Sequence, residues 1–160
     1  MDLNIRNRNR RFISIFAWFL VAVCMVIIFL LSNQVADESA ALSEGFLSKI
    51  MELFNTVIGL NTIRKTAHAF EYFGLAVLIF HAAYWTWHKS RPCFTFLIAL
   101  LYSISDEIHQ IFVPGRACRI TDICIDSLGA IAGILLCLTA VYLFNKLKRR
   151  RRLCKEKSTK

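Results

Sequence analysis

The feature that most constrains the fold is an uncharged apolar run from Phe12 to Leu31. Its length is about the twenty residues that an α-helix needs to cross a bilayer. A secretory signal peptide has a shorter apolar stretch, followed by small residues at a cleavage site. Ser39-Ala40-Ala41 resembles such a site only faintly. We therefore predict an uncleaved membrane helix over residues 12–31.

Three further apolar segments predict three more membrane helices, over residues 63–85, 92–112 and 121–144. Tryptophan and basic residues follow the first of these segments, as is typical of a membrane–water interface. Pro92 suits the first turn of the next helix. We therefore predict an all-α, polytopic membrane protein, with one domain over residues 1–160.

The stretch between the first and second membrane helices has a different pattern. Over residues 37–60, apolar side chains recur at helical spacing while polar side chains fill the other face. This pattern predicts an amphipathic helix that lies on the outer leaflet or packs onto the bundle.

The basic residues indicate how the helices are oriented. The net charge is +9, and Lys and Arg concentrate before residue 12 and in a basic tail over residues 145–160. Cytoplasmic flanks of membrane helices carry such an excess, so we predict that both termini are cytoplasmic. Contact with the bilayer accounts for the tail, and we predict no nucleic-acid binding. Five of the twenty Lys and Arg fall on the outer side instead: Lys49, Arg64, Lys65, Arg116 and Arg119.

Polar residues concentrate where the predicted helices meet the outer surface. Membrane helices carry ionisable residues only at a cost in free energy, so such residues are candidates for a functional site. The second helix enters from the outside, the third ends there and the fourth starts there. The candidates are Arg64, Lys65, His68, Glu71 and Tyr72 on the second helix, Asp106, Glu107, His109 and Gln110 on the third, and Asp122 and Asp126 on the fourth.

The cations among these candidates indicate an anionic ligand. Arg64 and Lys65 lie in the predicted first turn of a helix, where the macrodipole disfavours positive charge. Together with Arg116, Tyr72 and Gln110, they could hold a phosphate or carboxylate group. The same cations could instead pair with the carboxylates of the protein itself, in a network that only stabilises the bundle.

Histidine and carboxylate side chains could supply proton transfer. The catalytic candidates are His68, Glu71, Asp106, Glu107 and His109, with Asp122 and Asp126 as orienting partners. Metal sites also use the i, i+3 spacing of His and carboxylate, but hydrogen-bonded histidines are commoner, and we predict no metal. The sequence identifies no cofactor and no oligomeric state.

The polar residues form three motifs: Arg64-Lys65-x-x-His68-x-x-Glu71-Tyr72, Ser105-Asp106-Glu107-x-His109-Gln110-x-Phe112-x-Pro114-Gly115-Arg116, and Asp122-x-x-x-Asp126-x-x-Gly129. In these motifs the chain resembles the VanZ-like family, whose name comes from a protein linked to teicoplanin resistance. Asp126 departs from the pattern, because many members have asparagine there. The resemblance implies a small multi-pass protein of the bacterial cell membrane and associates it with antibiotic resistance.

These observations predict an outer-facing charged pocket that binds or modifies an anionic cell-envelope lipid or cell-wall precursor. Such a pocket would contribute to tolerance of glycopeptide antibiotics of the teicoplanin type. One alternative is a membrane-embedded hydrolase or transferase that acts on a lipid-linked substrate. Another is a non-catalytic structural or interaction protein.

Overall fold

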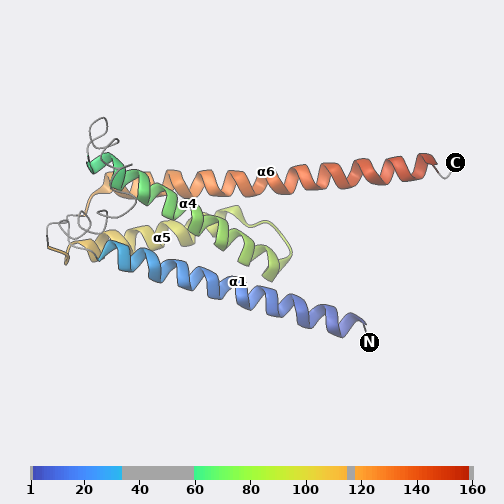
Figure 1. Ribbon diagram of the computed structural model, residues 1–160, viewed down its shortest axis with the longest axis horizontal. Coiled ribbons are helices and arrows are strands. Elements are labelled where there is room, and N and C mark those ends of the chain that lie inside the picture. The colour runs from blue at the N-terminus through green and yellow to red at the C-terminus, as the bar shows by residue number, and fades with distance from the viewer. Residues whose placement is uncertain (1, 34–59, 115–117, 159–160) are drawn as a thin grey trace, which may run out of the picture.

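Four helices form the regular structure of the chain (Figure 1). A computed structural model describes residues 2–33, 60–114 and 118–158. The helices are α1 (Asp2–Ser32), α4 (Leu60–Trp87), α5 (Pro92–Gln110) and α6 (Ile120–Ser158). No strand occurs among these residues, which confirms the all-α prediction for the described part of the chain. The predicted amphipathic helix lies outside that part, except for Leu60, which begins α4.

Alternating helix directions place both chain termini at the same end of the bundle (Figure 1). The C-terminal end of α1, the start of α4, the end of α5 and the start of α6 meet at the opposite end. Helix α4 is central, because it packs against α1, α5 and α6, whereas the backbones of α1 and α5 lie farther apart and these two helices meet through side chains. The predicted convergence of polar helix ends is therefore a consequence of this up-and-down arrangement.

Small residues allow α4 and α6 to approach closely. A Cβ atom added at Gly129 would overlap the backbone carbonyl of Ala69, and one at Gly133 would lie 2.6 Å from the carbonyl oxygen of Phe73. Alanines on α4 are themselves completely buried, among them Ala76, Ala82 and Ala83. Glycines four residues apart are a common pattern where two membrane helices pack closely, and this pair is used in that way.

Two of the helices are long and apolar enough to cross a membrane. They span Arg8–Ser32 and Ile120–Arg152, and most of their side chains face outward from the bundle. Helices α4 and α5 differ because charged residues interrupt their apolar sequence near one end. The apolar length expected of a membrane helix is thus confirmed for the first and the last of the four, and the four membrane crossings stay a prediction.

The observed helix ends differ from the predicted ones because hydropathy marks apolar segments and not helices. Helix α1 already begins at Asp2, and α6 continues through the basic tail to Ser158. Helix α5 ends at Gln110, not at residue 112. The N–H groups of the next three residues donate to carbonyls three positions earlier, at 3.0 to 3.2 Å. This tighter turn ends the helix before Pro114, which has no N–H group.

Candidate functional site

Five carboxylates gather at the end of the bundle opposite the termini. We call Glu71, Asp106, Glu107, Asp122 and Asp126 the carboxylate cluster; they come from α4, α5 and α6. Four of them are buried and Glu71 is half-buried. A buried carboxylate needs hydrogen-bond donors or a cation to offset its desolvation. The partners of each carboxylate therefore decide what this site can do.

Neutral donors hold Asp106. The hydroxyl of Ser32 donates to its Oδ2 atom at 2.7 Å, and the side-chain amide of Gln110 donates to the same atom at 3.3 Å. Gln110 reaches it because residues four apart lie on the same face of a helix. Among the described side chains, no cation forms an ion pair with Asp106. Its other oxygen, Oδ1, is buried and has no hydrogen-bond partner in the described part of the chain.

Asp126 is the most deeply buried member of the cluster, with 0% of its surface exposed. The hydroxyl of Ser103 donates to its Oδ2 atom at 2.7 Å. The Nδ1 atom of His68 lies 4.0 Å from its Oδ1 atom and 3.8 Å from Oε2 of Glu71. The Nδ1 atom of His68 therefore faces two carboxylates at ion-pair distance.

Glu107 connects the cluster to the segment between α5 and α6. Its Oε2 atom accepts a hydrogen bond from the backbone N–H of Arg119 at 2.9 Å. Asp122 follows in the first turn of α6, where the macrodipole favours negative charge. Lys65 of α4 lies 3.6 Å from the Asp122 carboxylate and is one-third exposed. This ion pair joins α4 to α6 at the rim of the site.

His109 and Tyr72 complete the buried part of the site. The His109 ring lies 4.4 Å from the ring of Phe29 on α1, and its Nε2 atom is buried with no hydrogen-bond partner among the described residues. Tyr72 has 0% exposure, and its ring centroid is 6.1 Å from that of Tyr102. Both side chains are therefore placed by aromatic contacts between helices.

The cations Arg64 and Lys65 lie farther from the start of α4 than predicted. Helix α4 begins at Leu60, so Arg64 and Lys65 lie in its second turn and not in its first. The effect of the macrodipole fades within the first turn, so it does not by itself demand an anion here. The side chain of Arg64 and all of Arg116 lie outside the described residues. Lys65 and Arg119 are the cations that the structure describes at the rim.

Two serines that were not among the predicted site residues donate hydrogen bonds to the cluster. Ser103 precedes Asp106 by three residues, so the sequence already places both side chains on the same face of the helix. Ser32 lies 74 positions from Asp106, and no local pattern signals that contact. The catalytic, binding and orienting roles assigned to the site residues stay predictions.

The fold and the site define a helical bundle with two helices able to cross a membrane and a buried carboxylate cluster at one end. The profile of the VanZ/LLP1 family matches residues 16–144, and the chain belongs to this family. The match includes all of α4 and α5, parts of α1 and α6, and every residue of the carboxylate cluster. Among curated proteins and solved structures, none matches the chain significantly.

Proposed function

We propose that the chain is a multi-pass protein of the bacterial cell membrane, with four transmembrane helices and both termini in the cytoplasm. Helix α5 is about 28 Å long at 1.5 Å per residue, close to the thickness of a bilayer core. Its exposed apolar residues, Leu97, Leu101, Ile104 and Ile108, recur at spacings of three and four. They therefore form one stripe that suits contact with lipid. The carboxylate cluster then lies near the outer surface.

The site at this surface binds an anionic cell-envelope lipid or a lipid-linked cell-wall precursor, and it contributes to teicoplanin-type tolerance. Lys65 and Arg119 at the rim, with Arg64 and Arg116 from the neighbouring sequence, attract the anionic headgroup. Behind them, the carboxylates and histidines orient the headgroup or exchange protons with it.

The observation that carries this proposal is the set of buried polar atoms without hydrogen-bond partners in the described part of the chain. Oδ1 of Asp106, Oδ1 of Asp126 and Nε2 of His109 come from two helices and lie at one end of the bundle. Buried polar atoms in proteins are nearly always hydrogen-bonded, so such a group suits a polar ligand. In a network that served only to hold the helices together, each buried polar atom would have a hydrogen-bond partner within the network.

Two observations support the alternatives. The position of His68 between Glu71 and Asp126 suits general acid–base catalysis, which favours a hydrolase or transferase on a lipid-linked substrate. The hydrogen bond from Ser32 to Asp106 ties α1 to α5, which favours a purely structural role.

The test is a binding titration of the purified protein with a polyprenyl-diphosphate-linked cell-wall precursor. We expect saturable binding that weakens when the rim is neutralised by Lys65→Gln with Arg119→Gln. The control, Lys146→Gln with Lys148→Gln, makes the same change in charge on the far part of α6 and leaves binding intact. Equal affinity in both double variants would refute the proposal. Analysis of the same samples for product decides between binding and catalysis, since an enzyme would lose turnover in His68→Gln.

A further inference from the structure

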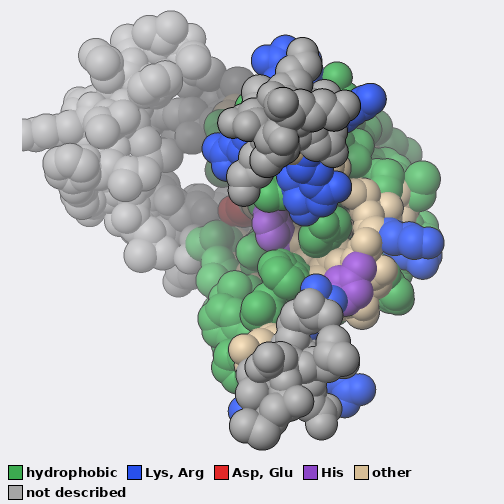
Figure 2. All heavy atoms as spheres, turned by 90° about the vertical axis from the view of Figure 1, so that its right-hand side faces the viewer, with side chains coloured by type: hydrophobic (Ala, Val, Ile, Leu, Met, Phe, Trp, Pro, Cys, Tyr) green, Lys and Arg blue, Asp and Glu red, His purple; other side chains and the backbone are tan. Residues whose placement is uncertain are grey.

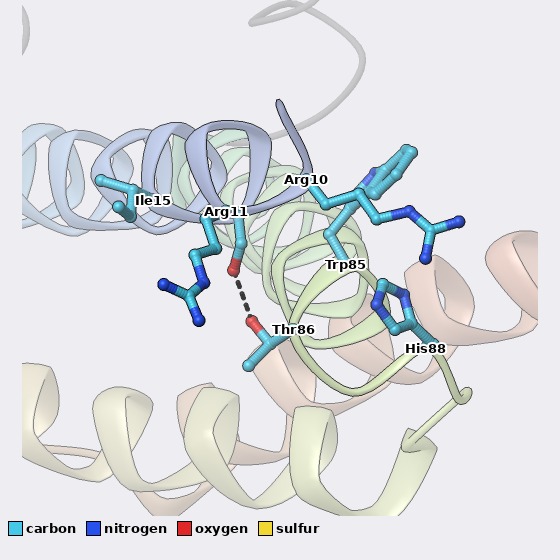
Figure 3. Close-up of a pocket in the computed structure, with 7 residues that line it drawn as sticks. Arg10, Arg11, Ile15, Trp85, Thr86 and His88 are labelled. Carbon is cyan, nitrogen blue, oxygen red and sulfur yellow. Dashed lines mark hydrogen bonds between the residues drawn. The ribbon is translucent and has the colours of Figure 1, made fainter. Parts of the chain in front are cut away.

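A second polar site lies at the opposite end of the bundle, beside the chain termini. An open groove of about 430 Å³ separates the N-terminal part of α1 from the C-terminal end of α4 (Figure 3). Arg10, Arg11 and Ser14 line it from α1, and Trp85 and Thr86 line it from α4, with His88 directly after that helix. None of these residues belongs to the carboxylate cluster.

Hydrogen bonds between the two helices form the wall of this groove. The Thr86 hydroxyl donates to the Ala82 carbonyl at 2.8 Å and accepts from the indole N–H of Trp18 at 3.0 Å. Since its own proton is used, the 2.7 Å bond to Ser14 has the Ser14 hydroxyl as donor. These bonds link α1 to α4 at the wall of the groove.

His88 has an unusual backbone conformation at the edge of the groove. Its φ angle is 55°, in the left-handed region, where a helix end normally has glycine. The His88 N–H still closes the helix by donating to the Tyr84 carbonyl at 2.7 Å. This conformation places the imidazole ring beside the groove, on the same side as Arg10 (Figure 3). A glycine would end the helix equally well but would add no polar ring.

No described side chain offsets the positive charge of this end. The sequence contains no Asp or Glu over residues 3–36, 72–105 and 127–155, which supply the described side chains of this end. Lys and Arg dominate the charged side chains in view there (Figure 2). The guanidinium of Arg91 lies 5.2 Å from the centre of the Trp87 ring. Tryptophan beside basic residues is typical of the headgroup level of a bilayer.

We propose that this groove binds the phosphate group of an anionic phospholipid on the side of the membrane that faces the termini. Arg11 lies beside the hydrogen bond of Thr86, and Arg10 lies on the other side of the groove with Trp85 and His88 (Figure 3). The guanidinium groups of both arginines bind the phosphate oxygens. His88 supplies a further polar contact, and Trp85 lies at the boundary between headgroup and acyl chains. The inference goes beyond the proposed function, because it concerns the other end of the molecule.

The experiment titrates the purified full chain in detergent with short-chain phosphatidylglycerol, short-chain phosphatidylcholine and inorganic phosphate in separate arms. We expect phosphatidylglycerol to bind more tightly than phosphatidylcholine. Each basic contact with an anionic lipid contributes about fivefold in affinity, so Arg10→Gln with Arg11→Gln lowers it about 30-fold. The matched control, Arg149→Gln with Arg150→Gln, removes the same charge from the exposed part of α6 and leaves the affinity unchanged.

A second variant separates a built site from a general surface charge. Arg10→Lys with Arg11→Lys keeps the positive charge that sets the orientation of α1 in the membrane. It loses the planar geometry by which arginine donates two hydrogen bonds to one anion. We expect weaker binding of phosphatidylglycerol by this variant than by the wild type. If inorganic phosphate binds as tightly as the lipid, the groove is a site for phosphate ions from solution. Equal losses in the Arg10/Arg11 and Arg149/Arg150 variants, or wild-type affinity in the lysine variant, would overturn the inference.

Discussion

At the scale of single residues, serine hydroxyls determine how the buried carboxylates are held. Ser32 donates to Asp106 and Ser103 donates to Asp126, each at 2.7 Å. In both cases the donor is neutral, so the hydrogen bond offsets part of the desolvation but none of the charge. An asparagine would accept the same bond, which explains why Asp126 can stand where the VanZ-like pattern has asparagine.

Asp126→Asn is therefore expected to fold and unfold like the wild type, because its amide oxygen still accepts from Ser103. Asp126→Ala leaves the Ser103 hydroxyl buried without that acceptor and lowers the free energy of unfolding by about 1–3 kcal/mol. Thermal unfolding of the purified variants in detergent measures both effects. An alanine variant as stable as the asparagine variant would contradict this account of the pair.

Part of this arrangement of the site residues was predictable from the sequence. The topology predicted that Asp106, Asp126 and His68 meet at one end, because adjacent antiparallel helices bring their ends together. It did not predict the bond from Ser32, which depends on how α1 is rotated about its axis. It also placed Arg64 and Lys65 in the first turn of a helix, because an apolar segment says little about where that helix starts.

At the scale of helices, the contact between α4 and α6 depends on glycines that lack space for a side chain. Gly129 and Gly133 lie one turn apart and face backbone carbonyls of α4. Small residues four positions apart favour such a contact between helices. Gly74 is also a helical glycine, but a Cβ atom there would meet nothing within 4 Å.

Gly129→Ala is expected to destabilise the bundle by about 1–3 kcal/mol or more, because the methyl group overlaps the Ala69 carbonyl and pushes the helices apart. Gly74→Ala, the matched control, is expected to stabilise it by about 1 kcal/mol through the higher helix propensity of alanine. Thermal unfolding of both variants measures the difference. Equal shifts of the two variants in the same direction would show that the helices do not pack as described.

At the scale of the whole molecule, the carboxylate cluster and the chain termini lie at opposite ends of the bundle (Figure 1). Cys118 is exposed near the cluster, and Cys93 is exposed near the termini, at the start of α5. These two cysteines can therefore report which end faces outward.

Two single-cysteine variants, one that keeps only Cys118 and one that keeps only Cys93, test the proposed orientation. A membrane-impermeant maleimide added to intact cells is expected to modify Cys118 at once and Cys93 only after permeabilisation. Mass spectrometry of the recovered protein measures the modification. Labelling of Cys93 alone in intact cells would place the cluster in the cytoplasm.

The general architecture was predictable because apolar length and basic flanks depend on composition. Hydropathy alone, however, could not show that α6 continues as one helix through Lys146–Arg152 to Ser158, since basic residues form helices well without being apolar. The groove beside Arg10 was equally hidden, because it arises from the packing of α1 against α4.

The most direct measurement compares teicoplanin tolerance in cells with equal amounts of wild type, Asp106→Asn or Ser32→Ala, in a strain whose tolerance depends on this chain. Asp106→Asn keeps an acceptor for Ser32 and removes the ionisable group, whereas Ser32→Ala removes the hydrogen bond and keeps the carboxylate. A functional site predicts that tolerance is lost with Asp106→Asn and retained with Ser32→Ala. Full tolerance with Asp106→Asn, and reduced tolerance with Ser32→Ala, would show that the cluster serves only to hold the helices together.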